Sequence, residues 1–102
     1  MEINKNLLWL ETGEKGEKGM ALTVRFTGRI GESAGMGLLL TGPDGYRLEQ
    51  KLFLTEEKEA VFFCPGVSLW DPEHPFLYHA AVTLECGEKI LAVREENIGF
   101  RT

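Results

Sequence analysis

Hydrophobic and polar residues alternate along most of the chain. In residues 22–27 the apolar positions are Leu22, Val24 and Phe26, and polar residues stand between them. The same period of two runs through residues 76–86. Side chains of a β-strand point alternately to its two faces, so this period predicts strands with one face in a core and the other in solvent.

Turn signals separate the alternating runs. The sequence GPDG at 42–45 places Pro and Asp-Gly at turn positions and predicts a hairpin between its flanking runs. Cys-Gly-Glu at 86–88 predicts a second tight hairpin. The stretch GEKGEKG at 13–19 is interpreted as a glycine-rich charged loop, because its short repeat is too brief for a repeat architecture.

Together these signals predict an all-β chain with no helix. The expected strands are residues 5–11, 20–28, 35–41, 46–54, 59–64, 76–86 and 89–97. Seven strands with frequent turns favour an immunoglobulin-like antiparallel β-sandwich, with a small barrel as the alternative. The length of 102 residues predicts a single domain spanning 1–102.

Composition and charge exclude some classes of partner. The formal net charge is −5, and an acidic surface repels phosphates, so nucleic acid is not an expected partner. No basic amphipathic stretch points to a membrane, and residues 1–20 hold no apolar run long enough for a signal peptide or spanning helix. We expect the isolated domain to be a monomer.

The two cysteines, Cys64 and Cys86, are predicted to remain thiols. They end the fifth and sixth strands, which lie in opposite sheets of an immunoglobulin sandwich. Ten residues of strand at about 3.3 Å each put them roughly 30 Å apart. A disulfide needs Cα atoms within about 7 Å. We expect Cys64 to be partly buried and Cys86 to lie near a hairpin, and unbridged thiols favour a cytoplasmic location.

The segment VSLWDPEHPFLY, residues 67–78, concentrates groups that can carry chemistry. Asp71 and Glu73 are a candidate acid pair for glycoside hydrolysis, but two solvated loop charges is the favoured interpretation, since no cleft-forming insertion lies nearby. His74 and His79 lack the further ligands that a metal site needs. We therefore predict no catalytic residue, no metal and no cofactor in this chain.

Exposed tryptophans can stack on sugar rings, and Trp9 and Trp70 are the candidates. Tryptophan is usually well buried, so packing in the core or in an interface is favoured for both. Sugar stacking stays the weaker hypothesis.

The segment LWDPEHPFLY at 69–78 and the later GFR at 99–101 resemble the end of the immunoglobulin-like β-sandwich domain of glycoside hydrolase family 2. That family includes β-galactosidases, β-glucuronidases and β-mannosidases. The matching residues are Leu69, Trp70, Pro72, Pro75, Leu77, Tyr78, Gly99, Phe100 and Arg101. The resemblance is dense over 67–102, whereas residues 1–66 match only in length and strand pattern.

The resemblance implies a non-catalytic role. In the family, the sandwich links an N-terminal sugar-binding-like domain to a catalytic (β/α)₈ barrel that holds the catalytic glutamates. A barrel of this kind needs about 250 residues, so this chain is expected to be a domain excised from a larger glycosidase and no enzyme by itself. The implied parent is a β-galactosidase-like enzyme of carbohydrate metabolism, and the implied partners are its neighbouring domains. The alternatives are a carbohydrate-binding module and a protein-interaction or adhesion sandwich.

Within this resemblance, the motif is expected to form a stiff corner between the sheets. Tyr78 stands at the start of the sixth strand, the place of the tyrosine corner, where its hydroxyl can bond an upstream backbone group. Pro72 and Pro75 stiffen the connection, and Leu77 completes the motif. Trp70 is expected to pack in the sandwich or against a neighbouring domain.

Two residues after the last strand are expected to face the barrel. Arg101 can pair bidentately with a carboxylate there. Phe100 is expected to be exposed or frayed when the barrel is absent.

Overall fold

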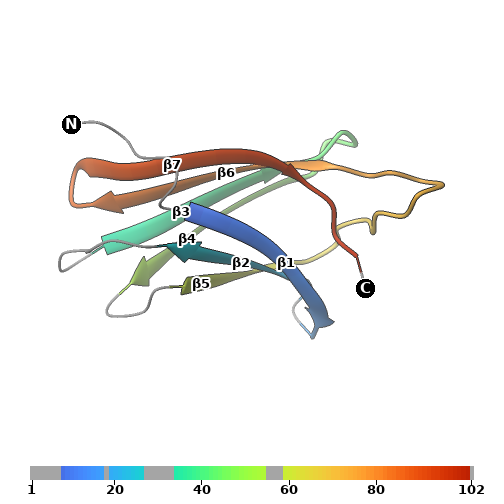
Figure 1. Ribbon diagram of the computed structural model, residues 1–102, viewed down its shortest axis with the longest axis horizontal. Helices are drawn as coiled ribbons and strands as arrows, with labels where there is room; N and C mark the ends of the chain where they lie inside the picture. The colour runs from blue at the N-terminus through green and yellow to red at the C-terminus, as the bar shows by residue number, and fades with distance from the viewer. Residues whose placement is uncertain (1–7, 18, 27–33, 55–58, 102) are drawn as a thin grey trace.

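The structure, a computed structural model, describes residues 8–17, 19–26, 34–54 and 59–101. Its seven strands form two antiparallel sheets that face each other (Figure 1). The three-stranded sheet has the order β1 (Leu8–Gly16), β2 (Gly19–Phe26) and β5 (Glu59–Cys64). The four-stranded sheet has the order β4 (Arg47–Leu54), β3 (Ala34–Thr41), β6 (Tyr78–Cys86) and β7 (Lys89–Ile98). The predicted all-β sandwich is confirmed, and the barrel alternative is wrong.

The predicted core faces are confirmed by the burial of alternate residues. Along β2 the inward residues Leu22, Val24 and Phe26 are buried, and along β6 every second residue from Tyr78 to Leu84 is buried. The core cluster draws residues from both sheets. No charged or polar side chain is buried among the residues that the structure describes. Hydrophobic burial between the two sheets therefore supplies the main stabilisation.

Both predicted hairpins are present. The β3–β4 hairpin turns at Gly42–Gly45, where the Gly42 N–H donates to the Tyr46 carbonyl at 2.9 Å and the Tyr46 N–H donates to Asp44 Oδ1 at 3.2 Å. This hairpin places β4 beside β3. In the constant-type immunoglobulin arrangement, by contrast, the fourth strand lies in the sheet of the first, second and fifth.

The first strand differs from the prediction. It was expected at 5–11, but β1 runs from Leu8 to Gly16, so part of the expected charged loop is strand. Pairing with β2 supplies the ladder that local propensity lacks, with a register shift between Thr12 and Lys15. Residues 5–7, and residues 27–28 of the expected second strand, lie outside the described residues.

The β1–β2 turn packs closely on the end of β5. Gly19 has φ of 113°, and a Cβ there would lie 2.6 Å from the carbonyl carbon of Cys64. Only glycine combines this backbone angle with so close an approach. The turn is therefore fixed against β5 at the point where the chain leaves for the corner segment.

Two side chains of the β4 region bridge the open edge between the sheets. Gln50 Nε2 donates to the Phe63 carbonyl at 3.1 Å, and the Tyr46 hydroxyl donates to the Pro65 carbonyl at 2.7 Å. These bonds satisfy carbonyl groups on and just beyond the exposed edge of β5.

The cysteines lie in opposite sheets as predicted, and no disulfide joins them. Cys64 is fully buried, more than the partial burial expected from the sequence. Burial disfavours the thiolate and raises the pKa of the Cys64 thiol to about 11. Cys86 pairs with Lys89 at the β6–β7 hairpin, where the sequence placed it.

Candidate functional site

The segment between β5 and β6 passes over one end of the sandwich, and the chain after β7 returns beside it (Figure 1). The segment between β5 and β6 contains a tight turn at residues 71–74. Asp71 Oδ1 accepts the N–H groups of Glu73 at 2.9 Å and of His74 at 2.7 Å. The Asp71 carboxylate thus holds the turn closed, while Glu73 and His74 are exposed. This is a structural use of Asp71, and nothing draws the two acids into a shared cleft.

Tyr78 ties this segment to the core. Its hydroxyl accepts the Ser68 N–H at 2.7 Å, ten residues upstream. Its buried ring contacts three others, with centroid distances of 5.3 Å to Tyr46, 5.1 Å to Phe76 and 5.6 Å to Phe100. The hydroxyl therefore fixes the crossing between sheets, in the way expected of a tyrosine corner. A Cβ at Gly42 would lie 2.7 Å from this ring, so the β3–β4 turn also packs on it.

The chain after β7 is joined to the corner segment by its backbone. Leu69 and Phe100 form a parallel bridge, and the Trp70 N–H donates to the Phe100 carbonyl at 2.7 Å. Phe100 is fully buried against Tyr78, so the expectation of an exposed or frayed residue is wrong. The bridge continues the alternation of β7 for two residues and turns Phe100 into the core. Ile98 and Phe100, two residues apart and both apolar, carried that signal in the sequence.

Next to this bridge lies a hollow of about 440 Å³, which we name the corner hollow. Its lining residues are Thr12, Trp70, Leu77, Gly99 and Arg101. A Cβ at Gly99 would lie 3.0 Å from the indole Cγ of Trp70, so glycine allows the Trp70 side chain to pack closely against the backbone. The Arg101 guanidinium stands over the same indole, 5.0 Å from a ring centroid.

The corner hollow gathers residues that the sequence singled out and others that it did not. Trp70 is half-buried, while Leu77 and Arg101 are exposed. Pro72 and Pro75 are exposed in the turn region and do not line the hollow. Thr12 was missed because it comes from the part of β1 beyond the predicted strand, and no local pattern links it to residue 70.

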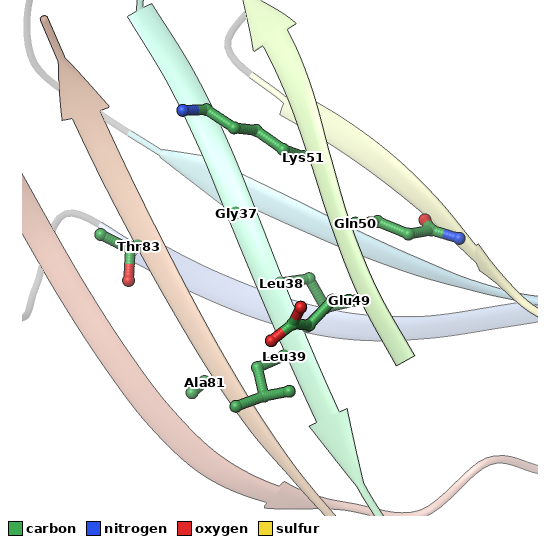
Figure 2. Close-up of a pocket in the computed structure, with 8 residues that line it drawn as sticks. All are labelled: Gly37, Leu38, Leu39, Glu49, Gln50, Lys51, Ala81 and Thr83. Carbon is green, nitrogen blue, oxygen red and sulfur yellow. The ribbon is translucent and has the colours of Figure 1, made fainter. Parts of the chain in front are cut away.

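A second hollow, of about 540 Å³, lies on the outer face of the four-stranded sheet, and we name it the β3 trough. Figure 2 shows Glu49 and Lys51 reaching from β4 across β3, with Ala81 and Thr83 on β6 opposite. Gly37 of β3 lies between these two pairs of residues, and no other atom lies within 4 Å of the place where its Cβ would stand.

The charges of the β3 trough are paired within the sheet. Glu49 accepts from Arg47 at 2.6 Å, and Lys51 forms an ion pair with Glu85 of β6. Gly35 leaves the space for this crossing, since a Cβ there would lie 3.1 Å from Lys51 Cε. The trough is thus a shallow, solvated feature with its charges already compensated.

Trp9 lies apart from both hollows, on the outer face of β1, and is 47% exposed. Arg25 is its cross-strand partner, and Arg25 pairs with Glu11 at 3.6 Å and with Glu59 at 3.4 Å. Packing of Trp9 in the core is therefore wrong, and its packing in an interface with another domain stays a prediction.

The two histidines make separate polar contacts. His79 Nε2 lies 3.1 Å from Glu95 Oε1, and its Nδ1 lies 3.2 Å from Asn97 Oδ1. The hydrogen bond with Glu95, and then that with Asn97, raises the pKa of His79. His74 Nδ1 lies 3.5 Å from Asp71 Oδ1 in the turn. In the part of the chain that the structure describes, no three His, Cys, Asp or Glu residues group to hold a metal, and no helix is long and apolar enough to cross a membrane.

The chain matches a family model described as glycosyl hydrolases family 2 over residues 11–101. No curated protein sequence matches it. Among solved structures, the β-glucuronidase from Ruminococcus gnavus is similar as the apo enzyme and in complex with D-glucuronic acid, each with a TM-score of 0.63 and 20% identity. Its complex with uronic isofagomine gives a TM-score of 0.64 at the same identity. Each match covers 93% of this chain and 15% of the other, so the chain spans about 15% of the length of these enzymes.

Proposed function

Because the chain belongs to glycosyl hydrolase family 2 and forms its immunoglobulin-like sandwich, we propose that it is the non-catalytic domain that joins neighbouring domains of a larger glycosidase. The observation that most directly supports this proposal is that the family's motif at 69–78 and 99–101 forms one packed unit. Its hydrogen bonds run from the Trp70 N–H to Phe100 and from the Ser68 N–H to Tyr78. The motif residues thus serve packing and chain direction.

The two candidate catalytic acids, Asp71 and Glu73, do not lie in the surroundings that catalysis requires. Asp71 accepts two backbone N–H groups of its own turn, and Glu73 is exposed beside it. A general acid for glycoside hydrolysis needs a raised pKa, which comes from an apolar pocket. An exposed turn offers no such pocket, and this supports placing the chemistry elsewhere in the parent.

The test of this proposal is hydrolysis by the 102-residue chain. We expect no turnover of aryl β-galactosides, β-glucuronides or β-mannosides. Turnover that disappears in Glu73→Gln, with the fold intact by circular dichroism, would overturn the proposal.

For the parent enzyme, we propose a β-glycosidase of carbohydrate metabolism, β-galactosidase-like as the sequence implies. The R. gnavus enzymes that share the fold are β-glucuronidases, and at 20% identity they support the fold alone. Assaying the parent on aryl β-galactoside and β-glucuronide side by side decides between the two sugars. The unbridged pair Cys64 and Cys86 supports a proposed location in the reducing cytoplasm.

Carbohydrate binding is a second candidate, and the exposed Trp9 is the observation that favours it. Trp9 is opposite Arg25 in the register, and Arg25 pairs with Glu11, an arrangement that can stack and hydrogen-bond a sugar ring. NMR titration with oligosaccharides tests it. Shifts clustered at Trp9 would support binding, and unchanged spectra at millimolar sugar would reject it.

A further inference from the structure

We propose that two copies of this chain associate through the free edge of β4, with the two β4 strands antiparallel and Gln50 opposite its own copy. β4 stands at the end of the four-stranded sheet, so among the described strands it is paired only on its β3 side. An open edge presents unpaired backbone N–H and C=O groups that a second strand can satisfy. The association needs only two copies of the chain and is independent of the proposed role in a larger glycosidase.

The other three edge strands carry features that protect a sheet edge. A register shift interrupts the β6–β7 ladder next to Glu85, and another interrupts the β1–β2 ladder between Thr12 and Lys15. β5 is the shortest strand, and the Gln50 side chain already bonds its Phe63 carbonyl. Irregular or occupied edges resist pairing with another chain. These three edges are therefore poor templates for a second copy.

β4 lacks this protection. It pairs with β3 over all eight of its residues without a register shift, and it contains neither proline nor glycine. A regular edge of this length is the kind that accepts another strand. Its charged residues are Arg47, Glu49 and Lys51, and charges on an edge normally repel a second copy. Whether β4 pairs with itself therefore depends on how these charges meet.

The alternating signs of the charges favour one register of self-pairing. All three charged residues lie on the outer face of the strand. Antiparallel pairing centred on Gln50 sets Glu49 opposite Lys51 of the second copy, and the two-fold symmetry repeats this contact. Centring the pairing one residue earlier sets Glu49 opposite itself, and centring it one residue later sets Lys51 opposite itself. Like charges directly opposite are destabilising, so the charges reject the neighbouring registers and accept this one.

The apolar residues of β4 fit the same register. On the inward side Leu48 lies opposite Leu52 of the second copy, and both leucines are half-buried and pack against the core. On the outer face Phe53 lies opposite Arg47 of the second copy. The Phe53 ring is 79% exposed in the isolated chain, and a guanidinium can stack on an aromatic face. Pairing therefore covers apolar surface on both faces of the strand.

The charged side chains have to exchange partners for this contact. In the isolated chain Lys51 pairs with Glu85, and Glu49 pairs with Arg47. The side chains of Lys51 and Glu49 are 52% and 63% exposed, and exposed pairs contribute little to stability, so their exchange is easy. The backbone ladder supplies most of the affinity, and the charges select the register. Because the contact is small, we expect a weak dimer in place of the monomer expected from the sequence.

Sedimentation of the 102-residue chain at micromolar to millimolar concentrations tests the dimer. We expect Glu49→Lys and Lys51→Glu each to weaken association at least about tenfold, because each sets like charges opposite at both symmetric contacts. Glu49→Lys also reduces the net charge from −5 to −3, so a general repulsion between copies would change in the opposite direction. Glu95→Lys on β7 changes the net charge equally and is the matched control, which should not weaken association.

Restoring the complementary charges tests the register. The double variant Glu49→Lys/Lys51→Glu, and an equimolar mixture of the two single variants, both place opposite charges across the contact again. We expect both to associate about as well as the original chain, with the folds checked by circular dichroism. Hydrogen exchange gives a second readout, because only the β4 amides that point away from β3 should slow as the protein concentration rises.

The remaining outcomes overturn the proposal. A chain that stays monomeric up to about 1 mM has no such contact, since that concentration corresponds to very weak binding. A dimer that both single variants leave unchanged uses another surface. A dimer that the single variants weaken and the double variant does not restore uses another register. Each of these results leaves the proposed glycosidase role standing, because that role is tested by hydrolysis.

Discussion

The corner end and the outer face of the four-stranded sheet hold charge in opposite ways. On the sheet face, Lys51 crosses β3 to reach Glu85, and Arg47 pairs with Glu49, so each cation has its anion within the sheet. At the corner end, Arg101 has an aromatic ring beneath it and no described carboxylate beside it. The cations of the sheet face are therefore paired within the sheet, whereas the Arg101 guanidinium lies over an indole ring.

The difference follows from how each region is built. Arg47 and Glu49 stand two residues apart on one face of β4, and the long Lys51 side chain crosses β3 above Gly35 to reach Glu85 on β6. The corner end instead joins two segments some thirty residues apart through one bridge, Leu69 to Phe100. The backbone and aromatic groups of the corner end contact each other within the chain, and the charged Arg101 lies at the surface. We expect substitutions at the corner's buried side to affect stability strongly, and those on the sheet face to affect it little.

The largest effect is expected for Phe100→Ala. The ring is fully buried against Tyr78, so its removal loses apolar burial and leaves a cavity, at a cost of about 3–5 kcal/mol in the free energy of unfolding. Urea denaturation followed by circular dichroism measures it. Phe53→Ala is the matched control on the sheet face, where the ring is 79% exposed, and should cost less than about 0.5 kcal/mol. Equal losses for the two variants would contradict the contrast between the regions.

Tyr78→Phe is expected to cost about 1–2 kcal/mol, because the Ser68 N–H loses its acceptor while the ring contacts remain. Tyr46→Phe removes a hydroxyl bond of equal length, 2.7 Å, to the Pro65 carbonyl. That bond is exposed to water, which can replace it, so the cost should be smaller. A larger loss for Tyr46→Phe would show that the edge between the sheets, and not the corner, depends more on its tyrosine. Both losses are read from the same urea titrations.

The sequence predicted the strands well because burial alternates with the period of the strand itself. The spacing of Leu22, Val24 and Phe26 identifies the buried face of β2 from the sequence of that strand alone. The end of β1 could not be predicted, since residues 13–16 become strand only through pairing with β2. Phe100 was misplaced for a different reason. The apolar spacing of Ile98 and Phe100 indicated its inward side, but the bridge to Leu69 that continues the alternation beyond β7 joins segments that no local pattern connects.

Lys51→Met tests the completeness of the sheet face. The Lys51–Glu85 pair is partly exposed, and such pairs contribute about 0–1 kcal/mol, so the expected loss is within about 0.5 kcal/mol. The methionine keeps the aliphatic stem over Gly35 and removes only the charge. Any loss should shrink further in 0.5 M salt, about three times the physiological ionic strength, because exposed charges are screened. A loss above 2 kcal/mol that salt leaves unchanged would mean that the sheet face depends on this charge in a way its exposure does not indicate.

The smallest effect is expected for His79, which follows Tyr78 on β6 but points outward to β7. Its hydrogen bonds to Glu95 and Asn97 raise its pKa above the ordinary 6.5, so its protonated form is favoured in the folded state. The resulting stabilisation is fully present below about pH 6.5, the unfolded pKa, and is lost as the pH rises through the raised folded pKa. The pair is exposed, so this contribution should stay below about 0.5 kcal/mol. Urea titrations of the wild type and Glu95→Gln at pH 5.5 and pH 8.5 measure it. The stability gap between the two proteins should narrow at the higher pH, and a gap that widened would contradict the assigned direction of the pKa shift.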